Sequence, residues 1–240
     1  IRTIMAGAKN GDFRELISPF LKGKISAMER EFGRGSEPLN AMLRQYAVSP
    51  AESHTLPDEN LRHYQAEVNL MFEGRPVFGV ERLYRRTILL EPTTVCAAHC
   101  RWCLRGQYPV RTMTEDDITH ATRYIGSAGL NGDVNEVLIT GGDPLMSLPL
   151  LGFTLGELAR NASNISIVRI GSRVPFQDPR RINDDLIAML QRHSEFRYEI
   201  GVNVCHPAEF WTESKVALKR LRDAGVTLYN QNPLLKGVND

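Results

Sequence analysis

Apolar residues change their spacing at about residue 86 of the chain. Before this point they recur at the three- and four-residue spacing of a helix face. After it, short apolar runs of strand length alternate with helical stretches. The pattern therefore predicts two parts, a helical N-terminal extension over residues 1–86 and an α/β core over residues 87–240.

The N-terminal extension is predicted to contain two helices. Asp12 and Glu15 have the offset of a capping box at the start of the first helix, and Pro19 is expected to kink or interrupt it. The second helix is expected over residues 37–48, with Ser36 as its N-cap. We interpret the apolar stripes of both helices as packing faces.

The core is predicted to alternate strands with helices. Five apolar runs are expected to be strands, over residues 87–90, 136–140, 165–170, 198–204 and 226–229. Four helices are expected between them, over residues 115–128, 150–161, 182–193 and 213–224. Thr114 and Thr212 would cap the first and last of these helices, and Gly129 and Gly225 would end them. This alternation predicts a parallel sheet with right-handed crossovers.

Two architectures place such a sheet among helices, the doubly wound sheet and the β/α barrel. Each predicted strand runs into polar or glycine-rich residues. Because parallel strands deliver their carboxyl ends to one edge, strands that end in this way favour the mouth of a barrel. We therefore expect the functional groups to gather at this edge.

Composition and charge narrow the class of protein. Of the 240 residues, 42% are hydrophobic and 24% are charged, as in a globular protein. Lys plus Arg number 29 and Asp plus Glu 28, so the net charge of +1 indicates neither a nucleic-acid partner nor a membrane surface. No apolar run approaches the roughly 20 residues that span a bilayer, and the first residues lack a signal-peptide pattern. We expect the protein to be in the cytoplasm, because clustered thiols stay reduced there.

Three of the four cysteines, Cys96, Cys100 and Cys103, stand within eight positions in a C-x3-C-x2-C spacing. Thiolates so close on one loop favour a soft metal over a disulfide, which would leave the third cysteine unpaired. A structural zinc ion needs four ligands and a four-iron cluster has one cysteine per iron. Three cysteines therefore predict a cluster with one open iron. A zinc module and three buried core cysteines are the alternatives, and Cys205 is interpreted as a small apolar filler.

The cysteine loop, with Trp102 before its last cysteine, resembles the cluster loop of radical S-adenosylmethionine (SAM) enzymes. Four later segments resemble successive blocks of the lysine 2,3-aminomutase family: LITGGDPL (138–145), RIGSRVP (169–175), NVCHP (203–207) and NQNPLLKGVND (230–240). The resemblance implies a [4Fe-4S] cluster whose open iron binds SAM, held by a partial (β/α)6 TIM barrel. Its last β/α unit would lie beyond this chain, which also starts without a Met, so we expect a fragment.

The same resemblance implies cofactor contacts at the strand ends. Gly141, Gly142 and Asp143 would meet the amino group of SAM, although these residues also suit a tight turn between a strand and a helix. Four polar residues at the ends of the next two strands would line the cavity for SAM and substrate: Ser172, Arg173, Asn203 and His206. An ordinary turn residue is an equal interpretation for the histidine, because a proline follows it.

Two further residues would bind the substrate. In the family, the arginine at the position of Arg105 binds the substrate's α-carboxylate, for which a guanidinium has a bidentate geometry. A solvated loop arginine is the alternative, and Gly106 follows where the family has further basic residues, which leaves the substrate open. Asp240 matches the family's acid for the distal ammonium group of lysine.

The implied activity is that of an amino-acid 2,3-aminomutase, which moves an amino group from C2 to C3. Pyridoxal phosphate (PLP) would be a further cofactor, with its Schiff-base lysine downstream of this chain. The implied partners are a small-molecule amino acid and an electron donor such as flavodoxin or ferredoxin, and a homo-oligomer is a further expectation. The alternatives are a radical SAM enzyme of the same fold without PLP, and the zinc module.

Overall fold

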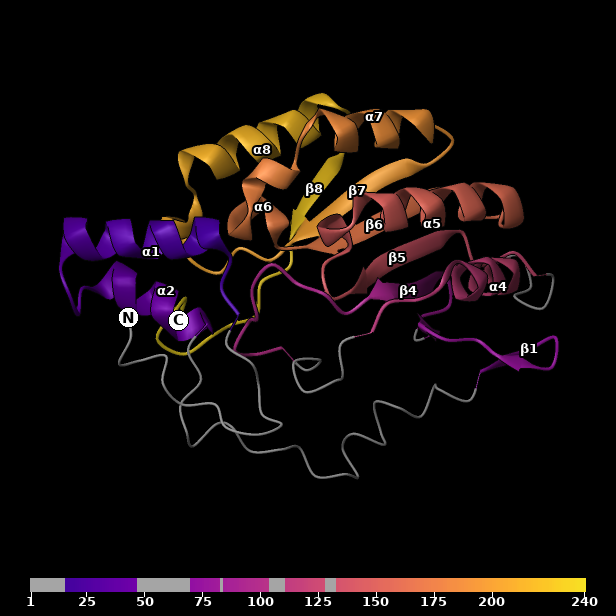
Figure 1. Cartoon of the computed structure of the whole chain (residues 1–240), viewed down its shortest axis with the longest axis horizontal. Coiled ribbons are helices and arrows are strands. Elements are labelled where there is room, and N and C mark those ends of the chain that lie inside the picture. Colours follow the sequence, from indigo (N-terminus) through magenta and orange to yellow (C-terminus); the bar gives the residue numbers. More distant parts are fainter. Residues whose placement is uncertain (1–15, 47–69, 83, 104–110, 128–132) are drawn as a thin grey trace, which may run out of the picture.

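A six-stranded sheet forms the centre of the molecule. The computed structural model describes residues 16–46, 70–82, 84–103, 111–127 and 133–240 (Figure 1). The strand order is β3-β4-β5-β6-β7-β8, and every neighbouring pair is parallel except β3 with β4. The strands are β3 (Val80–Glu81), β4 (Thr87–Thr93), β5 (Glu136–Gly141), β6 (Ile167–Ser172), β7 (Arg197–Val202) and β8 (Thr227–Asn230).

Four helices connect the parallel strands and cover one face of the sheet (Figure 1). They are α4 (Glu115–Ile125), α5 (Leu148–Asn161), α7 (Asp184–Arg192) and α8 (Thr212–Asp223). Shorter helical segments follow the strand ends: η3 (Pro144–Met146), α6 (Val174–Gln177), η4 (Pro179–Arg181) and η5 (Pro207–Glu209). The five parallel strands lie side by side in chain order. A doubly wound sheet reverses its strand order, so that alternative does not fit the described strands.

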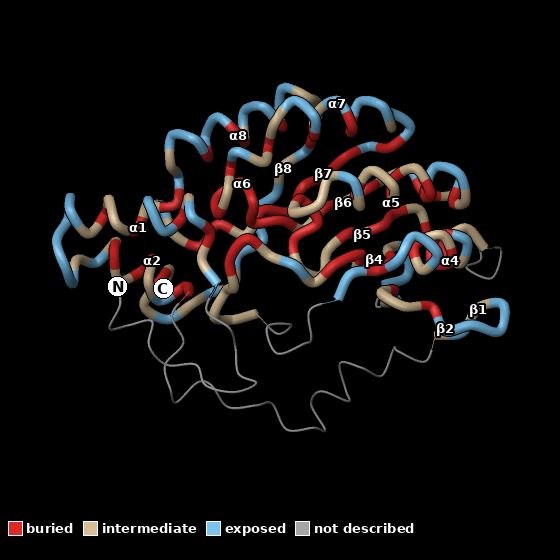
Figure 2. The backbone as a smooth tube through the Cα atoms, in the orientation of Figure 1, coloured by how far each residue is buried: buried red, intermediate tan, exposed pale blue. Residues whose placement is uncertain are grey.

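The main core lies between the sheet and these helices. Alternate residues of each strand point to the helix side, and there Ile88, Leu90, Val168 and Ile170 are all 0% exposed. Figure 2 shows much of the central strands as buried. The opposite face of the same strands is more polar, because it carries an ion pair between Arg169 and Glu199. The alternation thus makes one face of the sheet a packing surface.

The expected elements of the core are present with shifted ends. Thr114 caps α4 through a capping box with Asp117, as predicted, whereas the helix already ends at Gly126, and Gly129 lies outside the described residues. Gly225 follows α8 with a positive φ of 84°, which suits its predicted role as a stop. The prediction that Thr212 caps α8 was wrong, because Thr212 is the first helical residue and Trp211 precedes it without a side-chain cap.

The N-terminal extension contributes α1 (Pro19–Phe32) and α2 (Glu37–Tyr46). Pro19 does not interrupt a helix but begins one, because the first helical turn needs no N–H from its first residue, and the Ser18 side chain caps this turn. The expected capping box at Asp12 and Glu15 lies outside the described residues. The Ser36 hydroxyl, expected to cap α2, donates instead to the Gly33 carbonyl.

These two helices share a second, smaller core with the cysteine loop. Its buried apolar residues are Leu21, Ile25, Met28, Leu39, Met42, Tyr46 and Ala98. Ala98 lies between the first two cysteines of the loop. Figure 1 shows α1 and α2 beside the carboxyl ends of the strands, so the extension packs where the predicted functional groups gather.

Residues 71–81 are short strands, which corrects the helical assignment made for the whole of 1–86. β1 (Met71–Phe72) and β2 (Arg75–Pro76) form a hairpin whose two turn residues, Glu73 and Gly74, both have positive φ. β3 then pairs with β4, so the sheet begins before residue 87.

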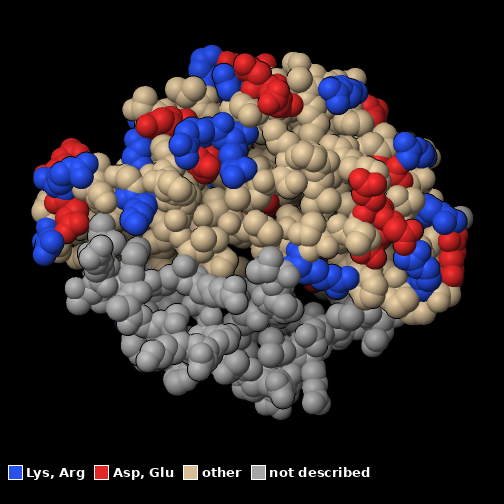
Figure 3. Space-filling model, viewed as in Figure 1, with Lys and Arg blue, Asp and Glu red and all other residues tan. Residues whose placement is uncertain are grey.

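The described surface mixes both signs of charge. On the face shown in Figure 3, basic and acidic side chains lie next to one another, in keeping with the net charge of +1. Among the described residues, no helix combines the length and the apolar composition needed to cross a bilayer.

Candidate cluster and cofactor site

The cysteine loop leaves the sheet at the end of β4. The pairing of β4 with β5 shifts register between Leu90 and Thr93, around Pro92, which has no N–H to donate to a ladder. Beyond this irregularity the chain bends into the loop that carries the three predicted ligands, Cys96, Cys100 and Cys103, which are partly exposed and form no disulfide. The loop therefore starts at the carboxyl end of a central strand.

Contacts from three directions hold the loop. The His99 N–H donates to the Leu16 carbonyl just before α1, and the Arg101 N–H donates to the Gln45 carbonyl at the end of α2. At the start of the loop, the Thr94 N–H donates to the carbonyl of Arg111. Because these bonds use backbone atoms, they fix the path of the loop without involving the cysteine sulfur atoms.

Gly141 and Gly142 let the loop lie directly against the end of β5. A Cβ on Gly141 would lie 2.6 Å from the Thr93 carbonyl oxygen, and one on Gly142 would lie 2.4 Å from the Val95 carbonyl oxygen. Gly141 also has a φ of 107°, which side chains disfavour. The Gly142 N–H donates to the Thr93 oxygen at 2.7 Å. The two glycines are therefore required by the close approach of two backbones.

Asp143 joins the end of β5 to the end of β6. Its carboxylate is 3% exposed and accepts bonds from the Ser172 hydroxyl at 2.8 and 2.9 Å and from the Arg173 N–H at 2.7 Å. The N–H groups of Leu145 and Val174 donate to it as well. Burial raises the pKa of Asp143, while these hydrogen bonds act to lower it.

This geometry gives Asp143 a structural role, and its expected contact with SAM stays a prediction. Four donors of the chain bond to a carboxylate that is almost inaccessible in this structure. Ser172, also expected to line the cavity, is 3% exposed and spends its hydroxyl on the same carboxylate. Both residues shape the site by fixing neighbouring strand ends.

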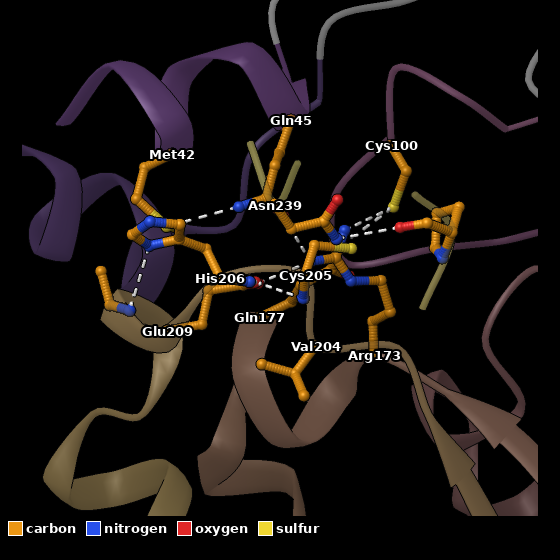
Figure 4. Close-up of polar contacts among 12 residues, drawn as sticks. Met42, Gln45, Cys100, Arg173, Gln177, Val204, Cys205, His206, Glu209 and Asn239 are labelled. Carbon is orange, nitrogen blue, oxygen red and sulfur yellow. Dashed lines mark hydrogen bonds and ion pairs between the residues drawn. The ribbon is translucent and has the colours of Figure 1, made fainter. Parts of the chain in front are cut away.

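Arg173 brings the cysteine loop, the N-terminal extension and the loop after β7 together. Its guanidinium is buried, and Nη1 donates to Cys100 Sγ at 3.0 Å. Nη2 donates to Gln45 Oε1 at 2.9 Å and to Glu209 Oε1 at 2.5 Å (Figure 4). Gln177 Nε2 lies 3.6 Å from the same Cys100 sulfur. One cysteine of the triplet thus receives two side-chain donors.

Two aromatic rings lie close to this guanidinium. The Arg173 Cζ lies 4.9 Å from the centroid of the Trp102 ring and 5.4 Å from that of Tyr46. Burial acts to lower the pKa of Arg173, but the charges of Cys100, Tyr46 and Glu209 raise it well above the usual value. The guanidinium is therefore a permanent cation at the site.

His206 has the contacts of a turn residue. Its Nδ1 accepts the N–H of Ala208 and its Nε2 faces Glu37 Oε1 at 3.3 Å, so the imidazole caps η5 and reaches α2. The N–H groups of His206 and Cys205 donate to Glu209 Oε2. Cys205 is 3% exposed and burial raises the pKa of its thiol to about 12, in keeping with a neutral filler.

The remaining predicted residues lie at the margins. Asn203 follows β7 and is partly exposed. Asp240 Oδ1 accepts the N–H of Gly237 at 2.6 Å, which closes a turn. Arg105, the expected carboxylate clamp, lies outside the described residues.

Sequence reasoning missed Gln45 and Glu209. Gln45 is 0% exposed at the end of an apolar helix stripe, where nothing in the local pattern distinguishes it from a surface glutamine. Glu209 stands three residues after His206, which is the offset of a capping box, so its local role could have been found. Its ion pair with Arg173 could not have been found from the local sequence, because Arg173 lies 36 residues away in the chain.

The donor set fits an iron–sulfur cluster. No three His, Cys, Asp or Glu side chains gather around one metal ion among the described residues, but each thiolate of a four-iron cluster binds a different iron. Three observations suit a cluster with a ligand beside it. The loop carries three thiols, the Cys100 sulfur receives two side-chain donors, and the buried Arg173 Nε has no hydrogen-bond partner.

The comparisons with known proteins agree with this donor set. The sequence model of the Radical SAM superfamily matches residues 90–240, which include the cysteine loop and all five parallel strand ends. The chain therefore belongs to the radical SAM superfamily, whose members carry a [4Fe-4S] cluster and SAM. The zinc module is accordingly not favoured.

Within the superfamily the chain is similar to several aminomutases. The chain is 36% identical over 172 residues to an L-lysine 2,3-aminomutase of Methanococcus maripaludis, covering 70% of this chain and 38% of the relative. It is 37% identical over 169 residues to that of Clostridium subterminale, covering 69% and 39%. A glutamate 2,3-aminomutase of Clostridioides difficile is 32% identical over 171 residues, covering 69% and 39%. The predicted family resemblance is thus confirmed, and the chain spans less than half the length of these relatives.

Proposed function

We propose that the chain is the cluster- and SAM-binding part of an amino-acid 2,3-aminomutase. The observation that carries the proposal is the coincidence of two things: a three-cysteine loop at the carboxyl end of β4, and a match through this region to both lysine and glutamate 2,3-aminomutases. We further propose that the sheet is part of a partial (β/α)6 barrel, since its parallel strands follow one another in chain order.

Cys96, Cys100 and Cys103 would hold the cluster and leave one iron for SAM. When bound, the cluster and SAM supply a 5′-deoxyadenosyl radical for hydrogen abstraction, and PLP supports the migration of the amino group. The backbone at Gly141 and Gly142, which lies directly against the cysteine loop at the end of β5, would form one wall of the SAM site. Asp143 would hold this wall to β6.

Two further residues are proposed to bind the substrate. In this proposal Arg105 binds the α-carboxylate, and Asp240 binds a distal ammonium group if the substrate is lysine. Glutamate offers no such group, so the role of Asp240 depends on the substrate. Asn203, partly exposed after β7, is proposed to line the cavity.

The proposed enzyme needs components beyond the described residues. A lysine in the rest of the full-length protein would form the imine with PLP, and a small electron-transfer protein such as flavodoxin or ferredoxin would reduce the cluster. We propose a cytoplasmic location, where the cluster thiols stay reduced, and a homo-oligomer as the assembly to look for.

The test uses the full-length protein, reconstituted anaerobically with iron, sulfide and PLP. Incubation with SAM, a reductant and single amino acids such as lysine, glutamate or arginine should give a β-amino acid together with 5′-deoxyadenosine. A full complement of iron and sulfide without a β-amino acid from any of them would favour a radical SAM enzyme that does not use PLP.

A further inference from the structure

The guanidinium of Arg173 is committed to a set of partners that no single loop could supply. Of its five N–H groups, one donates to Cys100 Sγ at 3.0 Å, one to Gln45 Oε1 at 2.9 Å and one to Glu209 Oε1 at 2.5 Å. The side chain is 6% exposed, so these contacts replace its hydration. The bond to sulfur is therefore held in place from two other sides.

Glu209 supplies the opposite charge. Its carboxylate is 1% exposed, with Oε1 on the guanidinium and Oε2 on the N–H groups of Cys205 and His206. A buried arginine without such a partner would be costly, and the pairing leaves the thiolate of Cys100 as the excess negative charge beside it. Glu209 holds the Arg173 guanidinium in position, and its negative charge partly offsets the positive charge of Arg173 at the Cys100 sulfur.

The N-terminal extension supplies an uncharged hydrogen-bond partner of Arg173. Gln45 is 0% exposed and binds Arg173 through its side-chain oxygen, while its backbone oxygen accepts the N–H of Arg101 in the cysteine loop. The rings of Tyr46 and Trp102 lie within 5.4 and 4.9 Å of the guanidinium carbon. The end of α2 thereby sets the distance between Arg173 and the loop (Figure 4).

We propose, on the basis of the proposed cluster function, that Arg173 is a positioning residue that raises the reduction potential of the cluster through Cys100, with Glu209 opposing it. Reduction adds one negative charge to a cluster. A cationic donor on a ligating sulfur stabilises that added charge, and a nearby carboxylate destabilises it. A lysine at this place would bring a charge without the fork that reaches Cys100, Gln45 and Glu209 together.

The test measures the cluster itself and needs no substrate. Anaerobic spectroelectrochemical titration of the full-length protein, with iron and sulfide counted, gives the potential for each variant. Arg173→Gln should lower the ratio of reduced to oxidised cluster at a fixed potential about tenfold, which is 59 mV for one electron. Glu209→Gln keeps an acceptor oxygen and should move the potential in the opposite direction.

An exposed ion pair provides the matched control. Arg34 and Glu29 are joined at 2.6 Å at the end of α1, with the arginine side chain 89% exposed. Arg34→Gln and Glu29→Gln make the same charge changes away from Cys100 and should leave the potential unaltered. They also show what a general loss of charge does to the titration.

The outcomes separate this inference from the proposed function. Equal potentials in the wild type, Arg173→Gln and Glu209→Gln, all with full iron content, would overturn the inference and leave the proposed function standing. A wild type that takes up no cluster would overturn both. Should Arg173→Gln fail to retain iron, the upward shift in Glu209→Gln decides the matter, and a downward shift or none there rejects the proposal.

Discussion

Arg173 Nη1 lies 3.0 Å from the Sγ of Cys100, although 73 residues separate the two in the chain. The contact brings the end of β6 to the loop that follows β4, across the intervening end of β5. Asp143 at that intervening end accepts the backbone N–H of Arg173 at 2.7 Å. Three adjacent strand ends are thus locked together around the cysteine loop, and each bond in this chain of contacts gives a testable consequence.

Asp143→Ala should lower the free energy of unfolding by about 3 kcal/mol, because it leaves the Ser172 hydroxyl and the N–H groups of Arg173 and Val174 without their charged acceptor. Guanidinium unfolding of the apo-protein measures this loss. Ser172→Ala removes only one donor and keeps the carboxylate, so it should cost about 1 kcal/mol.

SAM binding distinguishes this structural role from a direct contact. In Asp143→Asn the side chain keeps its shape and one acceptor oxygen, so cluster-loaded protein should bind SAM with nearly unchanged affinity in calorimetry. A loss of SAM affinity in Asp143→Asn at full cluster content, without a loss of stability, would show that the carboxylate contacts SAM after all.

Gly142→Ala should displace the cysteine loop. The added Cβ would lie 2.4 Å from the Thr94 carbonyl carbon and the Val95 carbonyl oxygen, and backbone atoms cannot move aside cheaply. We expect a loss of stability of about 1–3 kcal/mol, the range for overpacking, and a lower iron content after reconstitution. Thermal unfolding and iron analysis measure the two effects.

Gly156→Ala is the matched control for this substitution. Gly156 lies inside α5, and its nearest neighbour to a new Cβ is His193 Cε1 at 3.9 Å. Alanine is favoured over glycine in a helix interior by about 1 kcal/mol, so this variant should keep its iron and be slightly more stable. If Gly142→Ala were as stable and as rich in iron as Gly156→Ala, the close approach would not matter.

Local patterns predicted most of the elements and little of what joins them. The alternation of apolar runs predicted all five parallel strands to within a few residues, because strand length and polar ends are written in consecutive residues. The sequence pattern did not predict β1, β2 and β3, because each of these strands has only two residues and so shows no periodicity. Pro19 was misplaced because the same residue that breaks a helix interior suits its first turn.

The candidate site depended on contacts that a linear pattern does not contain. The cysteine spacing is local and identified the loop. The SAM contact expected for Asp143 came from the resemblance of its block to the family, whereas its partners Ser172 and Arg173 come from the next strand and were not predicted. Gln45 and Glu209 were missed for the same reason, because burial and pairing with Arg173 arise only when three distant segments pack.

Only the three clustered cysteines should be needed for iron. Replacing Cys96, Cys100 or Cys103 by Ala should each remove most of the cluster iron, whereas Cys205→Ala should retain it, because this buried thiol stays protonated with a pKa of about 12. Iron and labile sulfide per chain are counted after anaerobic reconstitution. Equal losses from Cys205→Ala and Cys100→Ala would contradict the assignment.

Arg105→Lys in the full-length enzyme should keep the cluster and SAM binding but lose most of the aminomutase turnover. Arg105 lies two residues beyond Cys103 in the sequence, so a carboxylate bound to it would have a fixed place relative to the cluster. A lysine keeps the charge and loses the bidentate fork, and a misplacement of about 1 Å can cost on the order of a hundredfold in rate.

The measurement compares β-amino acid with 5′-deoxyadenosine for wild type and variant across several amino acids. Arg123→Lys is the control, because Arg123 lies on α4 and its guanidinium pairs with Glu73 in the turn between β1 and β2, away from the cysteine loop. If Arg105 orients the carboxylate, its lysine variant should still form 5′-deoxyadenosine, because cleavage of SAM needs the cluster. The yield of β-amino acid should fall, because migration of the amino group needs a correctly placed substrate. Turnover at the wild-type rate would instead make Arg105 a solvated loop residue, and the carboxylate would have to be bound elsewhere.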